Sequence, residues 1–271
     1  MMQNVKSHIE PLRHQMVERY ILPLREGGSL PLLGEADDGF KYVIKMRGAG
    51  HGVKALVAEQ IGGETARAAG LRVPELVILD IDEAFGRTEP DPEIQDLLKA
   101  SQGLNLGMHF LNGAVTLDPY ANPVDEAEAS RIVWLDAFLT NVDRTARNTN
   151  MLVWHGQTWL IDHGASLYFH HAMSDVEKAA LTPFPFIKDH ALLRKASRLE
   201  EADAEMRSRL SPALLEEIVD TLPSEWLASE TQAGISEAEM RDIYKRFLTQ
   251  RFDNSNLFVN RAIDERRKIL I

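Results

Sequence analysis

The sequence contains no cysteine among its 271 residues, which excludes a disulfide framework and any metal site built from thiolates. No apolar run approaches the ~20 residues that a helix needs to span a bilayer. The N-terminal segment also lacks the apolar core of a signal peptide. We therefore expect a soluble, cytoplasmic protein that does not act in a membrane.

The chain also has fewer basic than acidic residues. The formal net charge of −11 argues against nucleic-acid binding through a broad basic surface, although it leaves room for a local basic patch. The chain has no internal repeat and no low-complexity segment. With 44% hydrophobic residues, it can form one large domain or two lobes.

The most informative stretch of the chain is 139–168. A polar loop is followed there by two short apolar runs, 151–154 and 158–161, with a glycine-containing turn between them. Two such runs around a turn predict a β-hairpin. The hairpin would bring the polar loop close to the residues that follow the second run.

Asp143 and Asn148 lie in that loop, and the second run ends on Asp162-His163-Gly164. Two carboxylates and an amide are oxygen donors that suit a hard cation such as Mg²⁺. Phosphoryl transfer uses the same set, with one Asp accepting a hydroxyl proton while an Asn and a second Asp hold metal. Each residue alone could simply cap a turn. The joint spacing, Asp-Arg-x-x-x-Asn before the hairpin and Ile-Asp-x-Gly after it, favours the metal-dependent reaction.

A predicted apolar strand at 40–46 carries Lys45, and a predicted helix at 53–69 carries Glu59. An ion pair between the two would fix the ammonium where the phosphates of a nucleotide can meet it. Glu64, further along the same helix, is the alternative partner. The simpler interpretation is an edge lysine in water and glutamates on a solvated helix face.

A glycine-rich connection at 47–52 joins this strand to this helix, an order that also occurs in dinucleotide-binding units. In the G-x-G-x-x-G fingerprint the third glycine would fall at Val53. The acidic end of the next strand lies about 30 residues beyond Gly50, whereas the fingerprint places it about 20 residues on. We therefore prefer a flexible connection without a dinucleotide.

Further elements are predicted from periodicity and helix caps. Residues 8–26 begin with helical spacing and end extended, and the composition shifts between 107 and 108, where we place a lobe boundary. Asp136, on the helix before the polar loop, could bond the loop backbone or be an ordinary surface acid. Ser211-Pro212 and a capping box at Ser236 predict helix starts. The other predicted strands and helices are 30–34, 73–82, 91–100, 108–111, 124–139 and 255–268.

Several motifs taken together resemble one known family. They are Arg25-Glu26-Gly27-Gly28-Ser29-Leu30-Pro31, Tyr42-Val43-Ile44-Lys45, Ala58-Glu59, Gly70-Leu71-Arg72-Val73-Pro74, Trp134-Leu135-Asp136-Ala137-Phe138, Asn141-Val142-Asp143-Arg144-x-x-x-Asn148 and Leu160-Ile161-Asp162-His163-Gly164. The chain resembles the HipA-like kinases, a compact bacterial branch of the protein-kinase-like fold whose catalytic loop is related to that of phosphoinositide kinases. The motifs span most of the chain between residues 22 and 195.

This resemblance implies an α+β, two-lobed protein-kinase-like fold, with a small antiparallel-sheet lobe at 1–107 and a larger, mostly helical lobe at 108–271. It implies ATP and Mg²⁺ as cofactors. Asp143 would be the catalytic base, and Lys45 would contact the phosphates and pair with Glu59. The other implied ligands are Gly27, Gly28 and Ser29 over the phosphates, Met108, His109, Phe110 and Leu111 beside the adenine, and Asn148 and Asp162 on Mg²⁺.

The sequence departs from the family pattern in three ways. His163 stands where better-known kinases carry Phe after the metal-binding Asp, so a switch based on that Phe is not expected. Thr145 stands where lipid kinases and several HipA-like proteins carry His. The large amino-terminal subdomain of the founding HipA proteins is not expected here, so their partner contacts cannot be carried over.

Residues 165–195 would form the activation and substrate-binding segment. Four histidines in or beside it invite a zinc-site interpretation, but none has HExxH spacing and cysteine is absent, so we expect core or surface roles. They are His163, His170, His171 and His190. Three hydroxyl groups are candidate phosphoacceptors by position alone, namely those of Ser166, Ser174 and Thr182.

The leading hypothesis is an ATP- and Mg²⁺-dependent kinase that phosphorylates a Ser or Thr hydroxyl of a protein. A small-molecule or lipid kinase is the first alternative, because the motifs require only a hydroxyl acceptor. A nucleotide-binding regulatory module with little turnover, for example a toxin–antitoxin component with an antitoxin-like partner, is the second. The intact set of Lys45, Asp143, Asn148 and Asp162 favours an active kinase.

Overall fold

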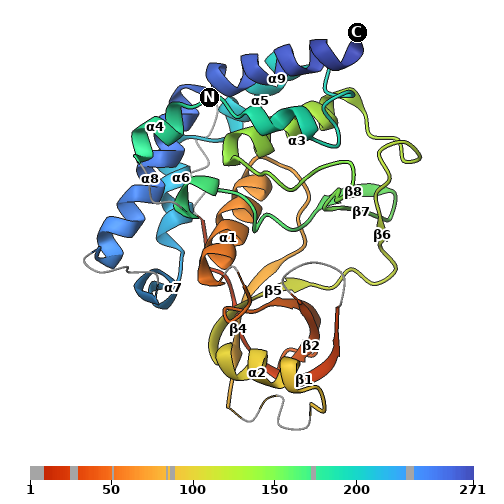
Figure 1. Ribbon diagram of the computed structural model, residues 1–271. Helices are drawn as coiled ribbons and strands as arrows, with labels where there is room; N and C mark the ends of the chain where they lie inside the picture. Colours follow the sequence, from red (N-terminus) through yellow and green to blue (C-terminus); the bar gives the residue numbers. More distant parts are fainter. Residues whose placement is uncertain are drawn as a thin grey trace, which may run out of the picture.

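The computed structural model describes residues 9–24, 30–50, 52–83, 85, 89–171, 175–229 and 235–271. They form a small β-barrel lobe and a larger, mostly helical lobe, which lie one above the other in Figure 1. The two-lobed α+β fold expected from the sequence is thus confirmed. None of the described helices is both long enough and apolar enough to span a membrane.

Five strands form a closed barrel in the order β1-β2-β3-β5-β4. They are β1 (His14–Pro23), β2 (Leu32–Ala36), β3 (Lys41–Lys45), β4 (Leu76–Ile81) and β5 (Gly103–His109). Neighbouring strands are antiparallel, as expected, except that β1 runs parallel to β4 and so closes the ring. β1 reaches both neighbours because its register against β2 shifts twice, and such irregularities bend a strand.

Two expectations about this lobe were wrong. The extended strand β1 occupies the region where helical spacing was expected to begin, because pairing with two strands outweighs local periodicity. The strand expected at 108–111 begins earlier, at Gly103, and ends at His109. The lobe boundary placed between 107 and 108 therefore falls inside β5, which pairs with β3 and β4.

The barrel has a small apolar core of its own. Tyr42 and Ile44 of β3 point into it, and α2 (Pro92–Ala100) covers it with Ile94 and Leu98. These residues are buried, so the barrel is a packed body that holds β3 rigidly at the edge of the active-site region.

α1 (Gly52–Ala68) lies between the barrel and the helical lobe, as Figure 1 shows. It is buried along most of its length, because α6 (Pro212–Asp220) and α7 (Ser224–Ser229) pack on it from the other side. The helix ends as predicted at Gly70, whose φ of 79° is the left-handed conformation of a C-terminal cap.

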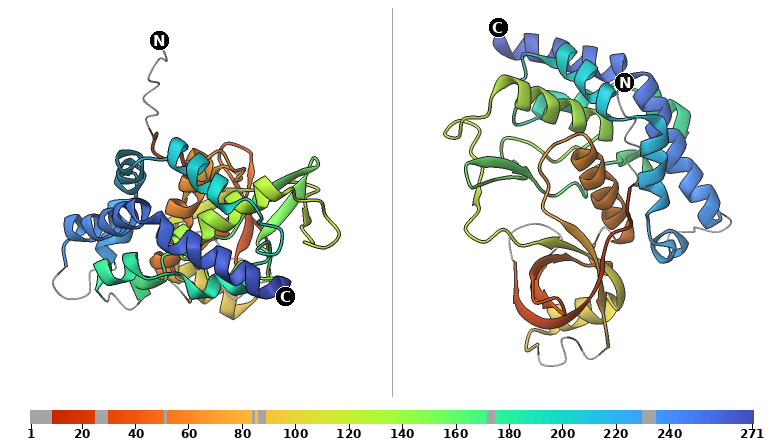
Figure 2. Two further views of the ribbon diagram at one scale, coloured as in Figure 1. Left: turned by 90° about the horizontal axis from the view of Figure 1, so that it is seen from above. Right: turned by 180° about the vertical axis from the view of Figure 1, so that it is seen from behind.

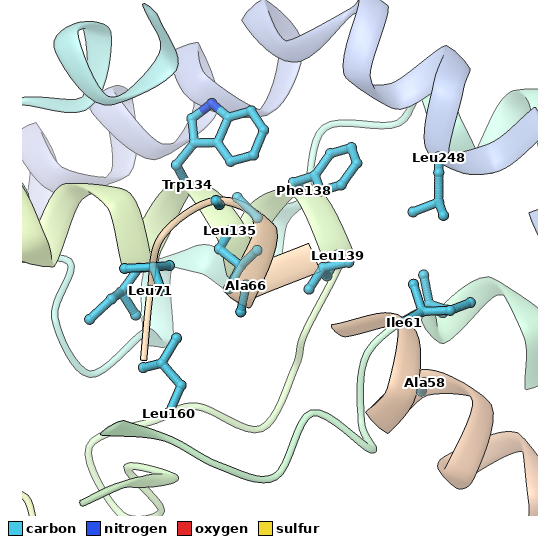
Figure 3. Packing of buried hydrophobic residues seen from close by; sticks show 14 of the residues in the cluster. Ala58, Ile61, Ala66, Leu71, Trp134, Leu135, Phe138, Leu139, Leu160 and Leu248 are labelled. Atoms are coloured by element: carbon cyan, nitrogen blue, oxygen red, sulfur yellow. The ribbon is translucent and has the colours of Figure 1, made fainter. Parts of the chain in front are cut away.

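The helical lobe is built around α3 (Glu126–Leu139), which is almost completely buried. Trp134, Phe138 and Leu139 of this helix belong to one buried cluster with Ile61 of α1, and Figure 3 shows Leu139 as the one of the three that lies nearest to Ile61. The rings of Trp134 and Phe138 stack with centroids 5.2 Å apart. The shared buried cluster joins the helix that carries Glu59 to the helix that leads into the polar loop.

The remaining described helices are α4 (Val176–Leu181), α5 (Leu199–Arg209), α8 (Glu237–Asp253) and α9 (Ser255–Leu270), with short 3₁₀ helices η1 (Tyr168–His171) and η2 (Pro185–Asp189). α5, α8, α9 and η2 pack on α3, α4 packs on α8, and Figure 2 shows this lobe from two further sides. The predicted cap at Ser211 and the predicted capping box at Ser236 are both present.

The predicted hairpin is confirmed, with β7 (Met151–Trp154) paired to β8 (Gln157–Leu160) and to a short strand β6 (Val115–Thr116). His155 and Gly156 have φ values of 48° and 72°, as a two-residue type I′ turn requires. The hairpin returns the chain to the polar loop.

Candidate active site

Lys45 lies at the centre of the site. Its Nζ is 2.6 Å from Glu59 Oε2 on α1 and 2.5 Å from Asp162 Oδ1, just after β8. The expected pairing with Glu59 is present, whereas Glu64 instead pairs with Arg67. The ammonium is therefore held between the barrel, α1 and the segment after the hairpin.

The charges in this group fix their protonation states. Burial alone would lower the pKa of the Lys45 ammonium, but the negative charges of Asp162 and Glu59 raise it above its ordinary value. Burial would likewise raise the pKa of the Glu59 carboxyl, but the Lys45 charge lowers it to about 2. Near neutral pH both groups are charged, so the lysine presents a fixed cation to the cleft.

His163 extends this group on its buried side. Its Nδ1 is 3.8 Å from Glu59 Oε1, longer than a hydrogen bond, and neither ring nitrogen has a hydrogen-bond partner. The ring packs against α1 at Gly62, where a Cβ atom would lie only 2.6 Å from His163 Cβ. The absence of a side chain at Gly62 therefore lets the Asp162-His163 segment approach the helix.

The polar loop places Asp143 beside two amides. Asp143 Oδ2 accepts Asn148 Nδ2 at 2.7 Å and Asn150 Nδ2 at 3.2 Å. Asn150 and Asp162 have φ values of 48° and 57°, a left-handed conformation that is costly for residues other than glycine and is concentrated at functional sites. The two amides therefore hold the Asp143 carboxylate in one orientation; Asn148 and Asn150 line the cleft described below, and Asp143 lies beside them.

A fully buried network beneath the loop supports it. Asp136 Oδ2 accepts Arg144 Nε at 2.6 Å and His190 Nε2 at 2.9 Å. Since His190 Nδ1 accepts the Leu192 N–H, the ring donates to Asp136 from Nε2. Burial would raise the pKa of the Asp136 carboxyl, but the Arg144 charge and the His190 hydrogen bond take it below its usual range.

Arg144 carries this support into the loop, because its Nη1 donates to the carbonyl oxygens of Asn150 and Ile161. It therefore ties Asp136 both to the loop and to the residue before Asp162. The sequence left the role of Asp136 open and gave no sign of a partner such as His190, which lies 54 positions away along the chain. Within the sequence, the only indication of this network was the Asp143-Arg144 pair of the loop motif, which contains Arg144.

A cleft of about 680 Å³ lies between the lobes beside Lys45. The four residues predicted to border the adenine, Met108, His109, Phe110 and Leu111, all line it, as do Asn148 and Asp162. Val43, Met151 and Ile161 add apolar walls. A mostly apolar cleft with a few convergent polar groups is the usual form of a small-ligand site.

The predicted glycine turn, Gly27, Gly28 and Ser29, lies outside the described residues. The residues that border it do belong to the cleft, because Leu24 and Pro31 line its wall. The Leu24 N–H donates to the Pro31 carbonyl at 2.8 Å, which fixes the two ends of the connection side by side over the cleft.

The residues present fit a magnesium ion better than a metal caged by protein. No group of three or more His, Asp or Glu side chains in the described ranges is arranged to hold a metal ion. Asn148 and Asp162 offer one amide and one carboxylate, and Mg²⁺ usually takes one or two protein oxygens together with phosphates and water. The two residues could hold the metal only jointly with a bound nucleotide.

Of the four histidines for which a zinc site was considered and not preferred, His170 bonds Tyr244 and contacts the ring of His171, while His163 and His190 take the places described above. Ser166 is buried, Thr182 is exposed and donates to the Lys178 carbonyl, and Ser174 lies outside the described residues.

Arg147, between Asp143 and Asn148, was not singled out in the sequence. Among the arginines that the structure describes, it alone forms no hydrogen bond or ion pair, and it is exposed. An unpaired guanidinium in the loop is available to an anion. Its only signal in the sequence was a second basic residue inside the loop motif.

A family model described as HipA-like kinase matches residues 17–261. A search of the curated proteins finds no match.

Among solved structures, the Helicobacter pylori proinflammatory kinase CtkA matches with a TM-score of 0.55 and 12% identity, over 96% of this chain and 99% of that chain. The Golgi casein kinase with Mn/ADP bound gives a TM-score of 0.46 and 13% identity, over 95% and 75% of the two chains. The first of these likenesses shows a protein-kinase-like fold. Because the family model spans most of the sequence, the chain belongs to the HipA-like kinase family.

Proposed function

We propose that this protein transfers the γ-phosphoryl group of ATP, with Mg²⁺, to a Ser or Thr hydroxyl of a protein. The observation that carries the proposal is the position of Lys45 Nζ, 2.6 Å from Glu59 and 2.5 Å from Asp162 at the edge of a cleft of about 680 Å³. Such a lysine–glutamate pair beside a metal-binding aspartate is required for phosphoryl transfer in protein kinases.

Each residue of the site has a defined task in this reaction. Asp143 accepts the hydroxyl proton as the acceptor oxygen bonds to the γ-phosphorus and the bond to the β-phosphate oxygen breaks. Asn148 and Asn150 orient that carboxylate. Lys45 binds phosphate oxygens as a fixed cation. Asn148 and Asp162 would hold Mg²⁺, which when bound neutralises charge on the phosphates.

The proposal is tested first by binding. Thermal unfolding is followed with and without ATP, in Mg²⁺ and in EDTA, for the wild type and Asp162→Asn. Saturation at about 100 times the dissociation constant adds about 2.7 kcal/mol of stability, so a clear rise in Tm is expected in Mg²⁺. The rise should be lost in EDTA and in Asp162→Asn. No rise for the wild type at millimolar ATP would contradict the proposal.

The acceptor class is tested by transfer of labelled phosphate from ATP to proteins, lipids and small alcohols in parallel. We expect label on Ser or Thr of a protein, and its loss in Asp143→Asn. Asp253→Asn is the matched control, because that exposed carboxylate ends α8, outside the site. Label in lipids or metabolites alone would replace the proposed acceptor by another hydroxyl, and equal transfer by Asp143→Asn would reject the assigned base.

A further inference from the structure

A second hollow, of about 290 Å³, lies on the helical lobe. Its walls come from Thr140 at the end of α3, Tyr168 of η1, Phe184 and Phe186 around η2, and Phe247 of α8. We call it the aromatic groove. It lies where α4 packs on α8, two helices that are adjacent in Figures 1 and 2.

Several apolar side chains in and beside the aromatic groove are exposed to solvent. Tyr168 is 56% exposed and Phe186 is 52% exposed, and Leu181, which precedes the wall residue Thr182, is also exposed. Phe184 is buried at its base. Clustered exposed aromatic side chains around a hollow are typical of a surface that binds a partner.

The groove is preformed, because Arg251 holds its walls. This buried side chain donates to the carbonyl oxygens of Ala137 and Phe138, at the end of α3, at 2.7 Å. It also donates to those of Ala180 and Thr182, at 2.9 and 3.0 Å. A single guanidinium thus fixes the segment before Phe184 against the helix that leads into the catalytic loop.

The segment that forms the groove is joined to the end of α3 at its start and to the catalytic loop at its end. At its start the Leu167 N–H donates to the Leu139 carbonyl at 2.7 Å, and at its end His190 pairs with Thr145. Thr140 precedes Asp143 by three residues, so their Cα atoms lie at most about 11 Å apart. An extended peptide advances about 3.3 Å per residue, so a peptide with its hydroxyl at Asp143 reaches Thr140 within a few residues.

We propose that the aromatic groove binds an apolar side chain of the protein substrate, two to four residues from the phosphorylated Ser or Thr. The inference rests on the proposed function, because it names the acceptor sequence that the same site selects. The occupant is a substrate rather than another partner because the groove is built from the segment that begins after Asp162 and ends beside Arg144.

The test is a peptide library with a fixed Ser or Thr and randomised flanking positions, phosphorylated by the wild type, Phe186→Ser and Tyr168→Ser. The wild type should prefer Leu, Met or Phe at one position by about tenfold, as expected for one apolar side chain in a pocket. Phe186→Ser should reduce that preference several-fold by raising KM, without changing kcat for peptides that lack the apolar residue.

Tyr120→Ser is the control, because Tyr120 is 89% exposed and does not line the groove. Each variant is first checked for an unchanged Tm and an unchanged shift with Mg²⁺ and ATP. Equal selectivity in the wild type and Phe186→Ser, or phosphorylation without any apolar preference, would overturn the inference alone. A sedimentation experiment adds another outcome, since an oligomer lost in Phe186→Ser with unchanged selectivity would assign the groove to a second copy and also overturn it.

A failure of the proposed function looks different in the same experiment. If no peptide is labelled while lipids or small alcohols are, the protein acceptor is wrong, and the inference is rejected with it. If peptides are labelled, the proposed function stands whichever side chains the library selects.

Discussion

Lys45 and Asp162 are 117 positions apart in the chain, yet Lys45 Nζ lies 2.5 Å from Asp162 Oδ1. Lys45 ends β3 of the barrel, and Asp162 follows β8 of the helical lobe. The contact therefore crosses the cleft between the lobes, so the cation proposed to bind phosphate and the carboxylate proposed to bind metal come together only in this arrangement of the two lobes.

Removing the ammonium should cost both activity and stability. In Lys45→Met we expect phosphotransfer to fall by at least about 100-fold, because a fixed cation on the phosphates is lost. The free energy of unfolding should fall by about 3 kcal/mol, because buried Glu59 is left as an unpaired charge. Kinase assays and urea unfolding measure the two effects.

The double variant Lys45→Met/Glu59→Gln separates them. Without the unpaired charge, most of the stability should return while activity stays low. Equal loss of stability in the single and double variants would show that Glu59 is not the residue destabilised.

Stability should depend on pH through Glu59. Its folded-state pKa of about 2 lies below the ordinary value of 4.5, so the folded protein binds this proton more weakly than the unfolded chain does. The contribution is therefore complete above about pH 4.5 and is lost as the pH falls toward about 2. Urea unfolding measures the free energy of unfolding at about pH 6 and at about pH 2.5. Between these pH values it should fall by roughly 2 kcal/mol less in Glu59→Gln than in the wild type.

Glu216→Gln is the matched control for this titration, since Glu216 is exposed on α6. It should follow the wild-type curve. If Glu59→Gln follows the wild type as well, the assignment of the acid-sensitive contribution to Glu59 is wrong.

Gly62→Ala should act against the usual preference of helices. Alanine in place of glycine inside a helix normally stabilises by about 1 kcal/mol. Here the new Cβ would lie 2.6 Å from His163 Cβ, so we expect lower stability and, because Asp162 directly precedes His163, lower activity. Thermal unfolding and the kinase assay give both quantities.

Gly63→Ala is a close control on the same helix. Its Cβ would meet the end of the flexible Leu76 side chain, also at 2.6 Å, away from Asp162. The stability of Gly63→Ala can differ from that of the wild type, but its activity at a temperature well below Tm should be unchanged. A stabilised and fully active Gly62→Ala would refute the argument from close packing.

Arg147→Gln should reduce turnover without weakening the fold. The Arg147 side chain is exposed and forms no hydrogen bond or ion pair with other described residues, so the free energy of unfolding should stay within about 0.5 kcal/mol of the wild type. If the Arg147 guanidinium binds an anion at the site, kcat of Arg147→Gln should be about 10- to 100-fold lower than that of the wild type, while the Tm shift with ATP changes little. Steady-state kinetics with a labelled acceptor test this.

Arg246→Gln serves as the comparison, because Arg246 lies on α8 in an exposed pair with Asp242. It should leave kcat unchanged. A wild-type kcat in Arg147→Gln would remove this arginine from the reaction.

The sequence by itself determined the features that short stretches of chain control. The hairpin follows from two apolar runs around His155-Gly156, a pair able to take the positive φ values of 48° and 72° that its turn needs. The caps at Ser211 and Ser236 depend on side chains that bond backbone N–H groups three residues away. The contact between Asp143 and Asn148 is also a local feature, because the two side chains lie in one loop and are hydrogen-bonded to each other.

Only the tertiary structure decided which distant groups meet. The choice of Glu59 over Glu64 depends on how α1 is rotated against the barrel, which Gly62 and its neighbour His163 control. Closure of the barrel by β1 and β4 and the bond between Asp136 and His190 likewise join residues dozens of positions apart. Such contacts depend on the packing of many side chains at once, so no local sequence pattern predicts them. Hydrogen bonds within a turn or at a helix end involve neighbouring residues, so a short sequence pattern can predict them.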